Sequence, residues 1–251
     1  MPQKEWFATW FDSPYYHLLY QHRDDNEAKL FLDNLVQQLA LPSGANVLDL
    51  ACGKGRHALT LAQMGFQVVG ADLAPNSILA AEASAQDLGI ENVNFTVHDM
   101  REALDMPPFD AVFNLFTSFG YFDTLAENQA VCKSVADMLL PNGLLVIDFL
   151  NATKVCANLK PIESIEREGV RFDIKRWYNN AHIFKQIEVI NAQDNMQIGI
   201  FTERVQALSQ TDFEALLSVD FEIVATYGSY HLTPFDQTTS DRLIILAKKK
   251  A

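Results

Sequence analysis

The sequence predicts an α/β fold in which helices cover both faces of a parallel sheet. Between residues 46 and 150, short apolar runs with the length of buried strands alternate with segments of helical spacing. Strands that alternate with helices form parallel sheets through right-handed crossovers. After residue 160 the alternation stops and strand-like runs follow one another directly, which predicts an added antiparallel sheet.

The elements of the parallel part are bounded by residues that begin or end helices. The helix predicted at 75–88 starts with Pro75 and is followed by Gly89, and these residue types are favoured at those two positions. We predict strands at residues 46–51, 67–72, 93–97, 109–116 and 144–150, with further helices at 26–40, 56–64 and 125–140.

The second half of the chain has a different pattern of predicted elements. Turn residues separate three runs with strand composition, at residues 170–177, 182–190 and 197–205. We therefore expect an antiparallel insertion of about three strands. Thr211 and Glu214 then have the spacing of a helix capping box, and the runs 221–227 and 243–247 are predicted to complete the main sheet.

These patterns divide the chain into four parts. The parts are an aromatic and helical N-terminal segment (1–40), the parallel core (41–160), the antiparallel insertion (161–208) and the remainder of the core sheet (209–251). The edges of the insertion allow a homodimer, although such edges can also be covered within one chain.

Charge and composition limit the partners and the compartment. The formal net charge of −13 repels phosphate backbones and anionic lipids, which disfavours a nucleic-acid or membrane-surface protein. No apolar run approaches the roughly 18 to 20 residues of a membrane helix, and residues 1–10 lack the features of a signal peptide. The scattered Cys52, Cys132 and Cys156 predict neither a disulfide framework nor a metal site. We expect a cytoplasmic protein with reduced thiols.

The clearest chemical signal follows the first predicted strand, in the segment VLDLACGKGRH. Gly53 and Gly55 let the backbone approach a ligand closely, and the helix that follows offers its N-terminus to an anionic group. Asp49, at the strand end, offers a negative charge to a cationic group. S-adenosylmethionine carries both groups, a carboxylate and an ammonium, on its methionine end. Taken alone, such a turn is also an ordinary connection between a strand and a helix.

Two more acids follow the next two strands. Asp72 lies about 20 residues after the glycine turn, where an acid accepts hydrogen bonds from ribose hydroxyls. Asp99 can accept from an adenine amino group, with Met100 packing on the ring. Because ligands bind at the carboxyl ends of strands in open α/β sheets, acids at successive strand ends predict one ligand site.

The segments DLACGKGRH, VVGADLA and HDM resemble the first three motifs of class I S-adenosylmethionine-dependent methyltransferases, and the resemblance covers about residues 40 to 150. It implies a Rossmann-like, doubly wound sheet of seven strands with the last strand antiparallel, here with the insertion after strand five. It also implies a binding site for the cofactor. The implied cofactor-binding residues are Asp49, Ala51, Gly53 and Gly55 at the methionine end, Asp72 at the ribose, Leu73, Asp99 and Met100 at the adenine, and Asn114, Leu115 and Phe116 at the methyl-transfer site.

Beyond residue 150 the chain resembles small-molecule N-methyltransferases, in which an aromatic N-terminal segment and an insertion form a lid over the acceptor. This resemblance implies a small-molecule acceptor, with an amine favoured. The Asn/Asp-Pro-Pro-Tyr motif of DNA amino methyltransferases is absent after the fourth strand, where the sequence is NLFTSFGY.

Candidates for contact with the acceptor or for a base are Tyr16, His17, Tyr20, Phe119, Tyr121, Tyr230 and His231, with Tyr16, Tyr121 and His231 favoured, and Tyr20 is also a candidate clamp for the cofactor. Methyl transfer from a sulfonium releases a neutral group, so alignment in a dry pocket can supply most of the acceleration. An amine acceptor must be unprotonated, and a base assists without being obligatory. Against a role in catalysis, aromatic side chains also simply pack a segment onto a core.

The sequence also allows other functions and other acceptors. A nicotinamide-dependent oxidoreductase would carry a third glycine in its turn, and the segment CGKGRH lacks it. A non-catalytic protein that binds S-adenosylmethionine would keep the same glycines and acids. Within methyltransferases, a hydroxyl, an RNA or a protein is the alternative acceptor, and the acidic charge disfavours RNA.

Overall fold

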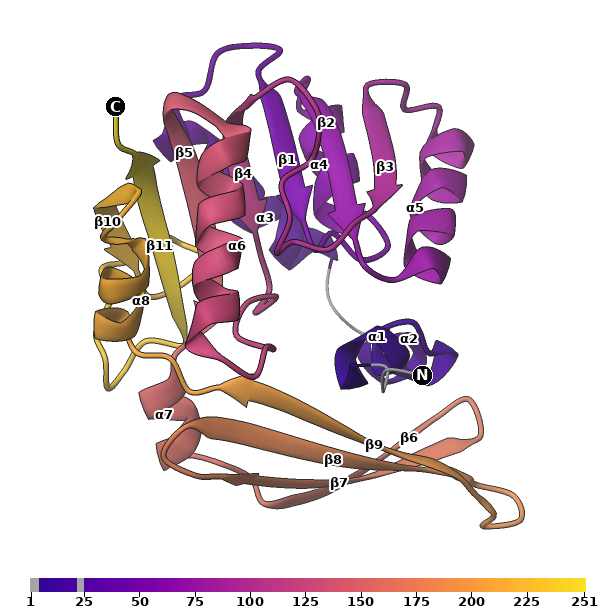
Figure 1. Ribbon diagram of the computed structural model, residues 1–251. Helices are drawn as coiled ribbons and strands as arrows, with labels where there is room; N and C mark the ends of the chain where they lie inside the picture. Colours follow the sequence, from indigo (N-terminus) through magenta and orange to yellow (C-terminus); the bar gives the residue numbers. More distant parts are fainter. Residues whose placement is uncertain (1–4, 22–24) are drawn as a thin grey trace.

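The computed structural model describes residues 5–21 and 25–251 and consists of two sheets with helices (Figure 1). The main sheet contains β1 (Asn46–Leu50), β2 (Gln67–Asp72), β3 (Val93–Val97), β4 (Phe109–Asn114), β5 (Leu139–Leu150), β10 (Phe221–Tyr227) and β11 (Arg242–Lys249). Their order is β10-β11-β5-β4-β1-β2-β3. β11 pairs antiparallel with both of its neighbours, β5 and β10, whereas β5, β4, β1, β2 and β3 pair parallel with one another. This confirms the predicted seven-stranded Rossmann-like fold.

Helices cover both faces of the main sheet because alternate strand residues point to opposite sides. One face packs on α3 (Asp25–Leu39), α4 (Arg56–Gln63) and α5 (Pro75–Leu88), and the other on α6 (Leu125–Met138) and α8 (Gln210–Leu217). Neighbouring residues of β5 show the alternation, since Val146 belongs to the first core and Ile147 to the second. Both are almost completely buried, so the middle of the sheet is covered on both faces.

The first turn of α8 departs from the prediction. Ser209 caps the helix, its hydroxyl accepting from the Asp212 amide while the Asp212 carboxylate accepts from the Ser209 amide. The predicted box of Thr211 and Glu214 lies two residues further along and is wrong. Both pairs have the required spacing, and the helix begins early enough to use the first.

The second sheet consists of four antiparallel strands in the order β6-β7-β8-β9. They are β6 (Ile162–Arg167), β7 (Val170–Tyr178), β8 (His182–Asn191) and β9 (Gln197–Gln206), followed by the main-sheet helix α8, while α7 (Ala152–Ala157) precedes them. The expected number of about three strands was one too low. The strand not counted was β6, an edge strand with the polar sequence IESIER and an exposed Ile162.

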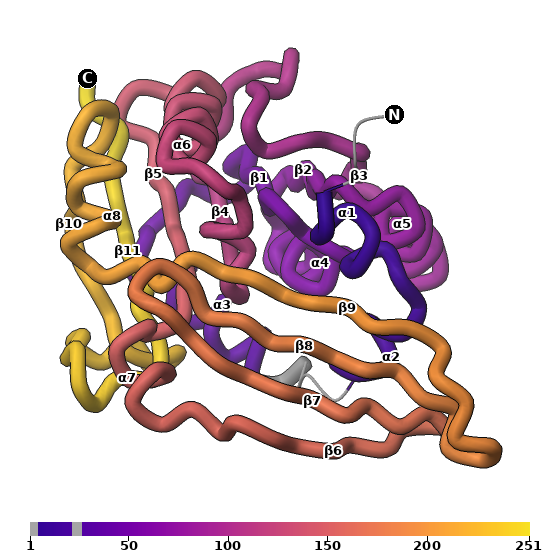
Figure 2. The backbone as a smooth tube through the Cα atoms, turned by 60° about the horizontal axis from the view of Figure 1, so that its bottom comes forward, coloured from indigo at the N-terminus to yellow at the C-terminus, as the bar shows by residue number. Residues whose placement is uncertain are grey.

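The first described part of the N-terminal segment, residues 5–21, lies between the two sheets (Figure 1). It contains α1 (Trp6–Trp10) and α2 (Pro14–Tyr20), and Figure 2 shows β9 running past both. Trp10 packs into the core of the second sheet, while the Phe7 ring meets that of Phe122 of the main domain at 5.5 Å. The segment therefore contacts both parts. Among the described residues, no helix is long and apolar enough to cross a membrane.

Candidate active site

A cavity of about 590 Å³ opens where the strands β1 to β4 end. One part of its wall is formed by residues at and just after the ends of these strands, and it contains most of the residues expected to bind the cofactor. The other part belongs to the N-terminal segment and to β9. The predicted residues on the wall are Tyr16, Tyr20, Ala51, Gly53, Asp72, Leu73, Asp99, Met100, Leu115, Phe116 and Tyr121. The topology thus gathers residues from separate motifs into one space.

The turn after β1 depends on its glycines. Gly53 and Gly55 have φ angles of +56° and +80°, in the region that favours glycine. A Cβ at Gly55 would lie 2.8 Å from the Phe95 ring and 2.9 Å from Ala81. Gly55 does not line the cavity; it lets α4 begin close against β3 and α5, which brings the helix N-terminus to the cavity.

Asp72 at the end of β2 holds this turn in place. Its Oδ2 accepts from the Gly53 amide and its Oδ1 from the Ala74 amide, both at 2.8 Å. Burial raises the pKa of the Asp72 carboxyl, and the backbone hydrogen bonds only partly oppose this rise. The result is a poorly hydrated hydrogen-bond acceptor on the cavity wall.

Asp49 and Asn114 lie behind the wall, at the ends of β1 and β4. Asp49 is 1% exposed, and burial raises its pKa to about 7, opposed by a hydrogen bond from the Ala58 amide. Its Oδ2 has no hydrogen-bond partner in the part of the chain that is described, and the same holds for Oδ1 of Asn114. The Asn114 side chain donates to the Leu50 carbonyl at 3.0 Å, which ties the two strand ends together.

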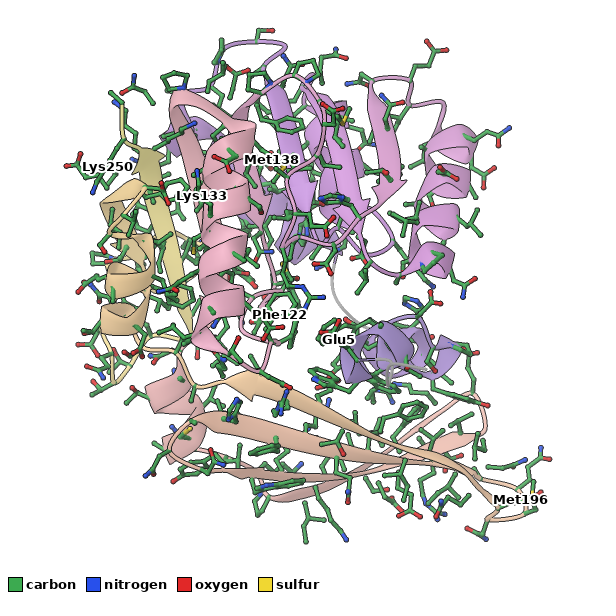
Figure 3. All side chains as sticks on the ribbon, in the orientation of Figure 1. Glu5, Phe122, Lys133, Met138, Met196 and Lys250 are labelled. Atoms are coloured by element: carbon green, nitrogen blue, oxygen red, sulfur yellow. The ribbon has the colours of Figure 1, made fainter. Side chains whose placement is uncertain are left out.

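Asp99 makes contacts that the sequence did not predict. Nε of Arg101 lies 3.1 Å from each Asp99 carboxylate oxygen, and Nη2 lies 2.6 Å from Oδ2. Burial acts to raise the pKa of Asp99, but the Arg101 contacts outweigh it and the pKa is lowered. Arg101 also pairs with Glu5 and Glu127 at 2.9 Å. Figure 3 shows Glu5 and Phe122 at this junction of the N-terminal segment and the main domain.

The loop after β4 has an unusual backbone that a buried ion pair supports. Phe116 and Thr117 both have φ +64°, a conformation that is costly for residues with a side chain. Oδ2 of Asp148 accepts from the Phe116 amide at 2.9 Å, and Oδ1 pairs with Arg242 Nε at 2.7 Å. Arg242 also donates to the Thr117 hydroxyl at 2.9 Å. The only sequence signal was an acid, Asp148, inside an apolar run.

Glu203 of β9 also lines the cavity and was missed by the sequence reasoning. It accepts from the Trp10 indole at 2.7 Å and from the Tyr20 hydroxyl at 2.8 Å. No local motif marks it, because its place depends on how the insertion packs on the N-terminal segment.

His231 does not line the cavity. It is exposed, and its backbone amide donates to Ser229. The preceding Tyr230 points inward instead, stacking on Phe31 with ring centres 4.4 Å apart and donating to Asp148 at 3.2 Å. His231 is therefore not placed to contact an acceptor inside this cavity, contrary to the prediction from the sequence.

Residues 41–197 match the family model of the methyltransferase domain, which is more than half of the chain. The chain belongs to the methyltransferase domain family. A Bacillus subtilis (strain 168) protein named as a methyltransferase, YqeM, is 33% identical over 119 residues, or 47% of each chain. The methyltransferase thus spans about half the length of this curated relative.

Solved structures share the fold of the methyltransferase. An S-adenosylmethionine-dependent methyltransferase from Clostridium acetobutylicum ATCC 824 superposes with a TM-score of 0.81 at 17% identity, covering 94% of this chain and 96% of that one. CalS10 from Micromonospora echinaspora, an amino pentose methyltransferase with bound S-adenosylmethionine, gives 0.68 at 21% identity, covering 95% and 98%.

S-adenosylmethionine is the cofactor of this methyltransferase class, and the residues present fit it. The unpartnered carboxylate oxygen of Asp49 suits a nearby cationic group, and the turn at Gly53 leaves open space where a side chain would stand. The poorly hydrated Asp72 suits hydroxyl donors. Because the chain belongs to the methyltransferase domain family, the alternative of a nicotinamide-dependent oxidoreductase is rejected.

Proposed function

We propose that this methyltransferase transfers the methyl group of S-adenosylmethionine to an amino group of a small molecule. The observation that carries the proposal is the shared cavity. The strand-end residues and the aromatic side chains of the N-terminal segment line one space of about 590 Å³, the size of a small-molecule site. A macromolecular acceptor would need an open surface beside the cofactor residues, whereas α1, α2 and β9 cover them.

The cofactor, when bound, supplies a methyl group activated by a sulfonium. Asp72 would hold its ribose, Leu73 and Met100 would border its base, and Asp49, from behind the cavity wall, would supply negative charge near its ammonium. The rings of Phe7, Phe11 and other N-terminal aromatics exclude water from the cavity, which strengthens the polar contacts inside it.

Tyr16 and Tyr121 are the proposed contacts of the acceptor amine. The Tyr121 hydroxyl donates to the Thr117 carbonyl, so its oxygen can act toward the amine only as a hydrogen-bond acceptor. Such a contact orients an N–H group and leaves the nitrogen lone pair available. Alignment is the main contribution that we assign to the protein.

Calorimetric titration with S-adenosylmethionine tests the cofactor site. We expect saturable binding to the wild type and a loss of about ten- to a hundredfold in Asp72→Ala, since charged hydrogen bonds are worth about 1.5 to 3 kcal/mol. Asp72→Asn, which keeps one acceptor oxygen for the turn, should lose less. The matched control is Asp105→Ala, because Asp105 is exposed on a loop. Unchanged affinity in Asp72→Ala would contradict the assignment.

A methyl-transfer screen tests the acceptor. Small amines and amino sugars are compared with phenols, short peptides and RNA, and product formation is followed by mass spectrometry. Methylated amines support the proposal. Products found only on hydroxyls, peptides or RNA overturn the amine assignment while leaving the cofactor site standing.

A further inference from the structure

We infer that Glu203 and the aromatic rings beside it form a subsite for a positively charged group of the acceptor. This inference rests on the proposed function and narrows the acceptor to an amine that carries a second, cationic group besides the amino nitrogen that is methylated. Among the described cavity-lining side chains of the N-terminal segment and the insertion, Glu203 alone has a fixed charge.

The rings next to Glu203 form a continuous row along the wall. Successive ring centres from Tyr20 through Tyr16 and Phe11 to Tyr121 are 4.9, 5.0 and 5.1 Å apart. Aromatic faces attract ammonium groups by about 0.5 to 2 kcal/mol, more when water is excluded. A carboxylate that ends such a row gives the wall a preference for cations over neutral molecules of the same shape.

The Glu203 carboxylate is held rigidly in place. It is 19% exposed and accepts from Trp10 of α1 and from Tyr20 of α2. Neither of these two donors is charged, so they orient the carboxylate without neutralising it. A fixed anion loses little entropy when it meets a ligand, which favours selective binding.

Among the residues that the structure describes, Lys185 is the nearest cation to Glu203, and it competes with a ligand only in part. Its Nζ lies 3.9 Å from Glu203, at the outer limit of an ion pair, while it contacts the Tyr20 hydroxyl and lies 4.4 Å from that ring centre. Lys185 belongs to β8 and does not line the cavity. Lys185 therefore contacts Tyr20 and Glu203 from β8, whereas Tyr20 and Glu203 themselves line the cavity.

Binding of a simple cation tests the subsite directly. Tetramethylammonium is titrated into the full chain at saturating S-adenosylhomocysteine, with tert-butanol as a neutral probe of similar size. Because Trp10 donates to Glu203, tryptophan fluorescence and calorimetry both report occupancy. We expect saturable binding of the cation at millimolar concentration and at least about fivefold weaker binding of the neutral probe.

Two variants with opposite expected signs separate charge from loosened packing. Glu203→Gln should weaken tetramethylammonium binding by about tenfold, and Lys185→Met should strengthen it a few-fold, because a competing cation is removed. A merely structural effect would weaken binding in both. Glu166→Gln, an exposed charge change on the same sheet, is the matched control.

Three outcomes overturn the inference. They are equal binding of the two probes, an unchanged cation affinity in Glu203→Gln, and a loss of S-adenosylhomocysteine affinity in that variant with cation binding intact. The last outcome would move Glu203 to the cofactor site. Failure of the proposed function is distinct, since it means that no amine is methylated even by wild-type protein that binds both ligands.

Discussion

Asp49 illustrates at the residue scale how burial changes one carboxyl group. Its pKa is about 7 in the folded protein, whereas the unfolded chain has the ordinary value of 3.8. The folded state therefore binds the proton more tightly, and the free energy of unfolding falls as pH rises from about 4 to 7. We expect Asp49→Asn to remove about 2 to 3 kcal/mol of this fall between about pH 5 and 8 in cofactor-free protein. Urea denaturation of both proteins at about pH 5 and about pH 8 measures this change in the free energy of unfolding. An Asn variant with the wild-type pH dependence would refute the assignment, and Asp105→Asn is the exposed control.

The residues that the sequence could predict at the site are those that follow strands. Asp72 and Asp99 end up near each other because carboxyl ends of parallel strands meet at one edge of a sheet. Arg101 and Glu203 were not predicted. Arg101 pairs with Asp99 two residues before it and also with Glu5 and Glu127 from distant parts of the sequence, and Glu203 reaches the cavity wall through the packing of the insertion on α1 and α2. His231 shows the converse, as a loop position gives no information about which of two neighbouring side chains points inward.

At the element scale, the ion pair of Asp148 and Arg242 joins β5, β11 and the loop after β4. Removing one partner leaves the other buried without its counter-charge. We expect Arg242→Met to lower the free energy of unfolding by about 3 to 5 kcal/mol, as measured by chemical denaturation. The double variant Asp148→Asn/Arg242→Met should recover part of this loss. A loss in the double variant equal to the sum of the losses in the two single variants would show that the pair does not act as a unit.

Weakening the ion pair of Asp148 and Arg242 is also expected to lower the rate of methyl transfer. In Asp148→Asn one oxygen still accepts from the Phe116 amide, so the variant should fold while holding the loop less firmly. We expect kcat to fall more than the cofactor affinity, because Phe116 and Thr117 border the cavity at the end of β4. Steady-state kinetics with an identified amine acceptor measures both.

Helix boundaries could be predicted where a residue strongly favours the start or the end of a helix, as Pro75 and Gly89 do for α5. They were less predictable where short-range signals repeat. The capping box of α8 had two candidates in sequence, and β6 has the alternating polar pattern of an edge strand that is easily taken for a loop. Such features depend on partners that local sequence does not reveal.

At the scale of the whole molecule, polar contacts from several positions attach the start of the N-terminal segment to the rest of the protein. Glu5 pairs with Arg101, Asp12 accepts from the Asn76 backbone and side chain at 2.9 Å, and Trp10 donates to Glu203. Because α1 and α2 supply part of the cavity wall, a bound ligand should stabilise them in place. We expect saturating S-adenosylhomocysteine to slow amide hydrogen exchange in residues 6–20 by at least about tenfold. The hairpin of β6 and β7 is the internal control. Unchanged exchange in α1 and α2 would argue against this coupling.

The position of β11 has a consequence for how the chain matures during synthesis. This strand follows all the others in the sequence, yet it pairs between β5 and β10. A nascent chain that has not reached Arg242 therefore exposes two unpaired strand edges and carries Asp148 without its cation. Such intermediates are prone to edge-to-edge association. Closure of the main sheet, the loop after β4 and the finished cavity thus depend on the synthesis of this one strand.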